Sequence, residues 1–197
     1  MTGRGFRLAC GREEIELVDR LLREEGYGLE APSFDPWARV ALSGPRALGS
    51  SVAAFFGLVY IQDLTSMLPP LALAPREGEV ILDLCAAPGS KSGMLSRQVG
   101  RTGAVVANQP GQKRLAVLRN NRHLLECFNT VTTGYPGERF PDAGPFSGIL
   151  IDAPCSGWGT AEKHPRVTTL WTEDRTGPLI ELQRRLPLQV FIERHAR

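Results

Sequence analysis

Four short apolar runs constrain the fold of this chain more than any other feature of its sequence. They are VILDL (80–84), AVVAN (104–108), TVTT (130–133) and GILID (148–152). Segments of helical character at 91–99 and 111–126 separate the first three runs, and another such segment follows at 173–186. This alternation predicts a parallel sheet with helices on both faces, hence an α/β fold. After the segment at 173–186, residues 189–192 are the one further candidate for a strand.

The first 60 residues lack this alternation. Apolar side chains at helical spacing in 13–25 predict an amphipathic helix that stops at the glycines after it. Residues 27–60 are rich in Pro and Gly and carry scattered aromatic side chains, so we expect an irregular segment held by aromatic packing. We therefore divide the chain into an accessory lobe at 1–60, expected to contact RNA, and an α/β domain at 61–197.

Composition excludes several classes of protein. The chain has 197 residues, of which 42% are hydrophobic and 22% charged, as in globular domains. No apolar run is long enough to cross a bilayer, and the opening residues lack the apolar core of a signal peptide, so we expect a cytoplasmic protein without membrane contact. The four cysteines form no CxxC pair and have no histidine at ligand spacing, which argues against a metal site and indicates free thiols.

The charge pattern leaves two interpretations open. The net charge is only +2, but the chain has 3 lysines against 20 arginines. A coding preference for arginine explains this ratio, and so does an arginine-lined face for phosphates and bases. The segment 111–126 concentrates Lys113, Arg114, Arg119 and Arg122, which form either a solvated helix face or an RNA contact.

The first apolar run leads into ILDLCAAPGSKS, residues 81–92. Parallel sheets bind ligands at the carboxyl ends of their strands, and small residues in the first strand-to-helix loop admit a ligand to the backbone. A plain Pro-Gly turn is the alternative. The GxGxxG pattern of dinucleotide sites is absent, so the loop favours a nucleoside cofactor with few phosphates or a methionine-derived carboxylate.

The end of the second apolar run is the usual place for a residue that binds ribose hydroxyls. That place falls on Gln109, whose amide lacks the charge of a carboxylate. We therefore expect cofactor binding that is weaker by roughly 1 kcal/mol.

The fourth apolar run leads to Asp152 and Cys155, at the same edge of the predicted sheet as the first loop. The thiol could be inert filling. Beside an acid, however, it suits chemistry at C5 of cytosine, a carbon that is too weakly nucleophilic to take a methyl group directly. A thiolate that adds at C6 makes C5 electron-rich, and a carboxyl group at N3 or N4 stabilises the charge that develops.

The motifs DLCAAPGSK, VVAN, RLAVLRNN, IDAPCSG and ELQRRL occur in this order in the chain. Together with YIQDLTSMLPPLAL (60–73), they resemble the Nol1/Nop2/Sun (RsmB/NOP-type) family of RNA 5-cytosine methyltransferases. The resemblance implies a Rossmann-like class I methyltransferase sheet, S-adenosylmethionine as cofactor, and RNA as partner, with rRNA favoured over tRNA. Methylation of an amino group instead is disfavoured by Ala153 and Cys155.

The resemblance also implies roles for single residues. The cofactor loop is Cys85, Ala86, Ala87, Pro88, Gly89, Ser90 and Lys91, with Ser90 in place of a glycine. Gln109 stands where the family has an acid on the ribose, and Pro136 where it has an Asp near the adenine amino group. Asp152 is implied at both cofactor and target cytosine, and Cys155 matches the first family cysteine. Lys163 and Pro165 match a loop beside the RNA, and we expect further RNA contacts at Lys113 and Arg114.

Family members generally use two cysteines, with the nucleophile in a Thr-Cys motif about fifty residues after the first, a position that here falls beyond Arg197. The resemblance therefore assigns Cys155 to product release, whereas action of Cys155 as the nucleophile itself is the other possibility. The residues after 186, PLQVFIERHAR, resemble nothing in the family. We therefore expect a sheet without its C-terminal strands, in which run 148–152 forms an unpaired edge that favours self-association. The leading hypothesis is an RNA cytosine-C5 methyltransferase in which Cys155 and Asp152 are catalytic. The alternative is an inactive member that only binds cofactor or RNA.

Overall fold

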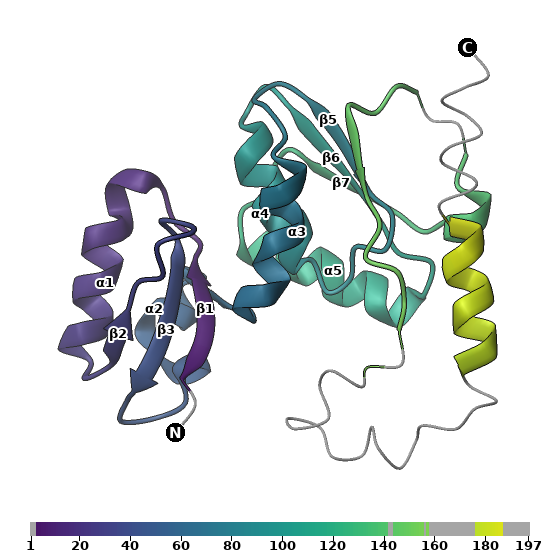
Figure 1. Cartoon of the computed structure of the whole chain (residues 1–197). Coiled ribbons are helices and arrows are strands. Elements are labelled where there is room, and N and C mark those ends of the chain that lie inside the picture. Colours follow the sequence, from purple (N-terminus) through teal and green to yellow (C-terminus); the bar gives the residue numbers. More distant parts are fainter. Residues whose placement is uncertain (1–2, 142–143, 156, 158–175, 187–197) are drawn as a thin grey trace.

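The computed structural model describes residues 3–141, 144–155, 157 and 176–186. Figure 1 shows an N-terminal lobe built on one sheet beside an α/β domain built on another. In the described ranges, no helix is long and apolar enough to cross a membrane.

The N-terminal lobe is a four-stranded antiparallel sheet with two helices. Its strands are β1 (Arg4–Leu8), β2 (Gly28–Glu30), β3 (Ala38–Ser43) and β4 (Val59–Ile61), in the order β2-β3-β1-β4. The helices α1 (Ile15–Glu24) and α2 (Val52–Phe55) pack on a core that includes Phe6, Leu8 and Leu22. The helix expected at 13–25 is confirmed, but the irregular structure expected for 27–60 is wrong.

Buried arginines explain why the sequence did not reveal these strands. Arg7 in β1 and Arg39 in β3 are 3% and 4% exposed, although an arginine inside a strand normally marks a solvent-facing position. The Arg39 guanidinium donates at 2.8 Å to the carboxylate of Asp19, a residue of helix α1. A charged pair thus occupies core positions and removes the alternation of apolar and polar residues by which a strand is recognised.

The α/β domain has the parallel sheet that the four apolar runs predict. Its strands are β5 (Val80–Asp83), β6 (Ala104–Asn108), β7 (Thr130–Thr133) and β8 (Gly148–Leu150), in the order β7-β6-β5-β8. The helices are α3 (Leu68–Leu73), α4 (Ser90–Val99), α5 (Gln112–Leu124) and an unlabelled helix at 176–186. In the described part of the chain β8 is an outer strand, as expected; the candidate strand at 189–192 lies outside the described residues.

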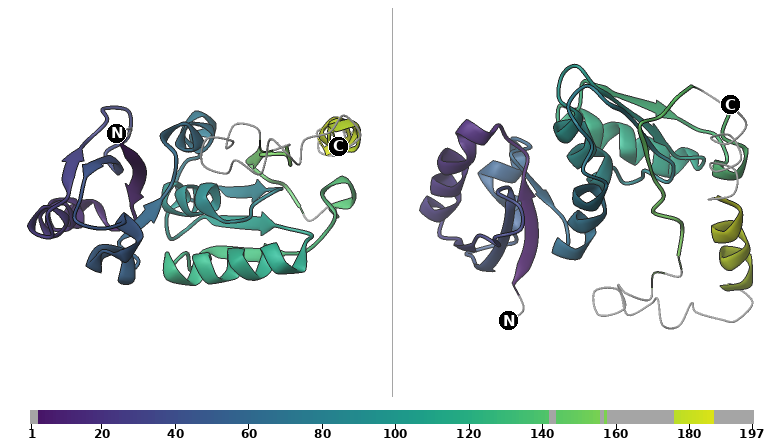
Figure 2. Two further views of the ribbon diagram at one scale, coloured as in Figure 1. Left: turned by 90° about the horizontal axis from the view of Figure 1, so that it is seen from below. Right: turned by 45° about the horizontal axis from the view of Figure 1, so that its top comes forward.

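Helices cover both faces of the parallel sheet (Figure 2). On one face, Leu95 of α4 and Leu115 of α5 pack with Ile81 of β5 in a common core. On the other face, Leu82 of β5 packs with Leu186 of the helix at 176–186. Successive residues of β5 therefore face opposite cores, which is why this run is apolar without interruption.

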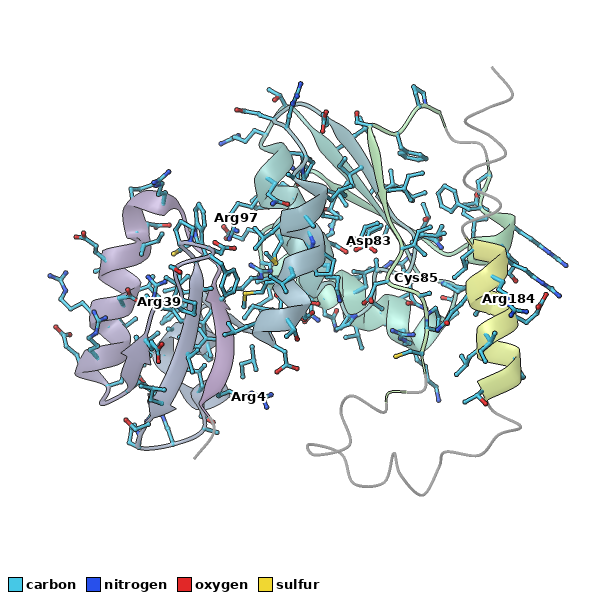
Figure 3. The ribbon with its side chains drawn as sticks, in the orientation of Figure 1. Arg4, Arg39, Asp83, Cys85, Arg97 and Arg184 are labelled. Atoms are coloured by element: carbon cyan, nitrogen blue, oxygen red, sulfur yellow. The ribbon has the colours of Figure 1, made fainter. Side chains whose placement is uncertain are left out.

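Arg97 of α4 joins the lobe to the α/β domain (Figure 3). Its guanidinium lies 3.8 Å from the centre of the Trp37 ring and 3.4 Å from the Asp35 carboxylate. Stacking and charge pairing act on the same group, so this contact fixes the guanidinium plane as well as its position.

Arg7 of β1 forms a second, buried joint between lobe and domain. Its guanidinium donates to the Gln62 side chain at 3.1 Å and lies 5.2 Å from the centre of the Tyr60 ring. A Cβ on Gly93 of α4 would come within 2.5 Å of the guanidinium, so this glycine makes room for it. Burial, with the nearby Arg97 charge, lowers the Arg7 pKa to about 10. The glycine therefore lets β1 pack close to α4 with this guanidinium between them.

Asn108, at the end of β6, connects three strand ends through its side chain. The amide nitrogen donates to the main-chain oxygens of Leu84 and Tyr135, at 3.1 and 2.8 Å. The amide oxygen accepts from the Thr133 hydroxyl and from the Tyr135 main-chain N–H, both at 2.9 Å. Asn108 is 0% exposed, so no water replaces these bonds. The asparagine fixes the spacing of β5, β6 and β7 at the edge where a ligand would bind.

Asp83 ends β5 just before the loop that leads to α4. Its carboxylate accepts a 2.6 Å hydrogen bond from the Ser92 hydroxyl and is 1% exposed. Burial raises the Asp83 pKa to about 6; the Ser92 bond and the Lys91 charge oppose this, and the Asp152 charge adds to it. The carboxyl group thus ties the strand end to the first turn of α4.

We predict that Asn108→Ala lowers the free energy of unfolding by about 2 kcal/mol, because it leaves buried main-chain groups without partners. The exposed Asn120 on α5 gives a matched control, and Asn120→Ala should change stability by less than about 0.5 kcal/mol. Urea unfolding of both variants measures the difference. Equal stabilities would show that Asn108 does not hold the strand ends.

A second prediction concerns the pH dependence of stability. Because folding raises the Asp83 pKa from 3.8 to about 6, the folded state holds this proton more tightly than the unfolded state. The stability that Asp83 contributes is therefore present at low pH and lost as the pH rises through about 6. The difference between 3.8 and about 6 corresponds to about 3 kcal/mol.

The measurement compares wild type with Asp83→Asn, which still accepts the Ser92 hydrogen bond but does not ionise. The stability of wild type relative to this variant should fall between about pH 4 and pH 7, while contributions from other groups cancel. A difference that does not change with pH would contradict the assignment.

Candidate active site

The loop between β5 and α4 closes the sheet edge where the site is expected. Ala86 and Ala87 are buried, and the Ala86 main-chain N–H donates to the Asn108 carbonyl oxygen at 2.9 Å. Gly89 has a φ of 105°, a left-handed conformation that favours glycine. Ser90 is already the first residue of α4, so the serine that replaces a family glycine is not strained.

Helix α5 holds this loop from outside the sheet. The Arg114 guanidinium donates to the carbonyl oxygen of Ala87, and the Asn121 amide donates to that of Pro88, both at 2.8 Å. The same Asn121 amide lies 3.2 Å from the hydroxyl of Tyr60, at the lobe. The Asn121 side chain thus contacts both the lobe and the loop, and it holds the loop on the side that faces α5.

Lys91 and Asp152 bring together the two segments that the sequence selected. The Lys91 ammonium, in the first turn of α4, lies 2.6 Å from the Asp152 carboxylate, just after β8. The Lys91 side chain is 13% exposed and that of Asp152 is 56% exposed. Such a pair contributes little to stability because water competes for the acid. Its importance is geometric, since it places the acid beside the cofactor loop.

The two cysteines at this edge differ in environment (Figure 3 labels Cys85). Cys85 is half-buried, and burial, with the nearby Asp83 and Asp152 charges, raises its pKa to about 11. Cys155 is exposed, and the residue before it, Pro154, accepts a 2.7 Å hydrogen bond from the Gln183 side chain of the helix at 176–186. Cys155 is the more accessible of the two thiols and therefore the better candidate to contact a substrate.

Gln109 lies at the end of β6, as predicted, next to the loop edge. It is 5% exposed, and its main-chain N–H donates to the carbonyl oxygen of Thr133 at 2.9 Å. Its side-chain amide forms no hydrogen bond with another described residue. Pro136, which replaces the family Asp, is exposed and has no polar side chain. Of these two described positions, only Gln109 therefore offers a polar side chain.

The remaining predicted residues divide into two groups. Lys113 is exposed on α5, whereas Arg114, predicted to contact RNA, donates to the cofactor loop. Lys163 and Pro165 lie outside the described residues. Across the described ranges, no group of three or more His, Cys, Asp or Glu side chains could hold a metal ion.

Sequence reasoning missed the residues that support the site from behind: Asp83, Ser92, Asn108 and Asn121. Asp83, Asn108 and Asn121 belong to the motifs that carried the resemblance, but their hydrogen bonds join positions up to 61 residues apart. The one available signal was a polar residue at the end of an apolar run, as at Asp83 and Asn108. Such residues indicate where a strand ends but not which residues they hydrogen-bond in the folded protein.

Known proteins are similar to this chain both in sequence and in structure. A human 28S rRNA (cytosine(4447)-C(5))-methyltransferase is 35% identical over 168 residues, which are 83% of this chain and 21% of the relative. Ribosomal RNA small subunit methyltransferase F of Pectobacterium carotovorum is 34% identical over 195 residues, 95% of this chain and 40% of the relative. This chain therefore spans less than half the length of these curated relatives.

A solved structure of a methyltransferase homologue from Pyrococcus horikoshii superposes with a TM-score of 0.81 at 27% identity. The match covers 96% of this chain and 60% of that one, so it includes both the lobe and the α/β domain. It confirms the Rossmann-like methyltransferase fold. The family described as 16S rRNA methyltransferase RsmB/F matches residues 70–194, which hold the loop, Gln109, Asp152 and Cys155. The match extends past residue 186, so the expectation that the residues after 186 resemble nothing in the family is wrong. This chain belongs to that family.

Proposed function

We propose that this chain transfers a methyl group from S-adenosylmethionine to C5 of a cytosine in RNA, with ribosomal RNA as the substrate class. The Lys91–Asp152 contact of 2.6 Å carries the proposal, because it joins the cofactor loop to the acid and thiol. Family membership and the names of the curated relatives support the same chemistry. The cytoplasmic location and self-association through β8 stay predictions.

The residues at the sheet edge fit S-adenosylmethionine. The loop has the small residues Ala86, Ala87 and Gly89, and its sequence lacks the glycine pattern of a pyrophosphate cradle. The Gln109 side-chain amide forms no hydrogen bond with another described residue, and it offers both a donor and an acceptor to ribose hydroxyls. Bound there, the cofactor supplies a methyl group made electrophilic by its positive sulfur.

The protein's own residues act on the target base. The Cys155 thiolate adds to C6 of cytosine, and the electron pair of the C5–C6 bond makes C5 nucleophilic toward the methyl group. Asp152 hydrogen-bonds the N3 and N4 edge and stabilises the charge that develops on the ring. Loss of the C5 proton to a base then restores the C5–C6 double bond and expels the thiolate. Lys91 acts as a positioning residue that holds Asp152.

We predict that Cys155→Ala reduces methyl transfer to background, because no thiolate remains to activate C5. The matched control is Cys10→Ala, which changes a half-buried thiol in the lobe and should retain activity. The assay supplies labelled S-adenosylmethionine and unmodified ribosomal RNA, with 5-methylcytidine as product. Full activity of Cys155→Ala would show that Cys155 is not the nucleophile. Cofactor binding by wild type without any product would favour the alternative, a chain that binds without turnover.

A further prediction concerns the helix that holds the cofactor loop. Asn121→Ala removes the hydrogen bond to the Pro88 carbonyl and should weaken S-adenosylmethionine binding about fivefold, which corresponds to about 1 kcal/mol. Asn120 directly precedes Asn121 on α5 and is exposed, so Asn120→Ala should leave the affinity unchanged. Isothermal titration calorimetry measures both. An unchanged affinity in Asn121→Ala would mean that α5 does not position the loop.

A further inference from the structure

A groove lies between the second half of α5 and the outer strand β7, away from the Lys91–Asp152 contact. Its volume is about 440 Å³, and its lining residues are Arg119, Arg122, His123, Phe128, Thr130, Val131 and Thr132. The cofactor loop contacts Arg114 and Asn121 of α5, so a single helix contributes to both places. None of the groove's lining residues belongs to the active site described above.

The groove is basic. Two arginines and a histidine line it without a carboxylate, and α5 has no Asp or Glu between Gln112 and Leu124. Anions therefore meet no opposing acid from the helix or from β7. This charge complements a polyanion such as a nucleic-acid backbone.

Both groove arginines are held in place by β7. The Arg119 Nε donates to the Thr132 hydroxyl at 3.3 Å, and an Arg122 Nη1 donates to the Thr130 carbonyl oxygen at 2.6 Å. A guanidinium has five N–H donors, so one anchoring bond leaves further donors on each. Anchored in this way, the two groups are ordered before a ligand arrives, which favours phosphate binding over a solvated and freely moving charge.

Apolar side chains line the same groove and are exposed to solvent. Phe128 is 85% exposed and Val131 is 59% exposed. An aromatic ring beside fixed arginines is the combination that binds unpaired nucleotides, because bases stack on the ring while phosphates contact the guanidinium groups. A protein partner for this groove would instead need carboxylates to match the arginines and an apolar surface to cover the ring.

We propose that this groove binds a single-stranded segment of the RNA that flanks the target cytosine, with phosphates at Arg119 and Arg122 and a base stacked on Phe128. The proposal rests on RNA as the substrate of the proposed function. The groove extends along β7 from Thr132 toward Thr130, away from the carboxyl edge where Gln109 lies. It therefore contacts nucleotides outside the reacting base and lengthens the RNA footprint beyond the active site.

The test measures binding of a short, fluorescently labelled single-stranded RNA to the 197-residue chain by anisotropy, over a range of salt concentrations. Arg119→Gln with Arg122→Gln should weaken binding at least about tenfold and reduce the salt slope by about 1.4, because two phosphates of a single strand are no longer neutralised by the protein. The control is Arg76→Gln with Arg101→Gln, two exposed arginines that precede the amino ends of β5 and β6, with the same change of charge. It should change affinity by less than about twofold.

Phe128→Ser separates stacking from charge at an exposed position, and circular dichroism and S-adenosylmethionine affinity check that each variant is folded. It should weaken RNA binding about tenfold with an unchanged salt slope. Equal behaviour of the groove and control variants, or no RNA binding by wild type, overturns the proposal. Weaker RNA binding by the groove variants in a chain that makes no 5-methylcytidine keeps the groove and rejects the proposed reaction.

Discussion

The site depends most on the hydrogen bonds that the buried Asn108 amide makes. Parallel strands diverge where a sheet opens for a ligand, and main-chain groups at those ends no longer have ladder partners. Asn108 satisfies them on both sides, at Leu84 and at Tyr135. It therefore holds apart the β5 end, which leads to the cofactor loop, and the β7 end, while Gln109 follows immediately on the same strand.

Helix α5 extends this support outward. Along its length it packs on the sheet through Leu115 and Leu118, holds the cofactor loop through Arg114 and Asn121, and lines a basic groove through Arg119 and Arg122. The Tyr60 hydroxyl reaches Asn121 from the lobe, and Arg97 of α4 stacks on Trp37 of the lobe. Lobe, loop and groove therefore all contact the same helix.

The α/β domain could be predicted closely because its signals are local. Runs 80–84, 104–108, 130–133 and 148–152 formed the four strands within two residues, and the intervening helices followed. The lobe could not be predicted in this way. Its strands carry Arg7 and Arg39 at core positions, and each becomes acceptable only through a partner elsewhere in the fold, Gln62 for one and Asp19 for the other.

By itself, the sequence determined the order of strands and helices in the α/β domain, the position of the loop after β5, and the selection of Asp152 and Cys155 as candidate reactive residues. These features depend on periodicity and on short motifs, which a few adjacent residues specify. Only the tertiary structure decided that Lys91 meets Asp152, that Arg114 holds the loop, and that Cys155 is exposed while Cys85 is half-buried. Such contacts join residues far apart in the chain, and burial and pairing are set by the packing of whole elements.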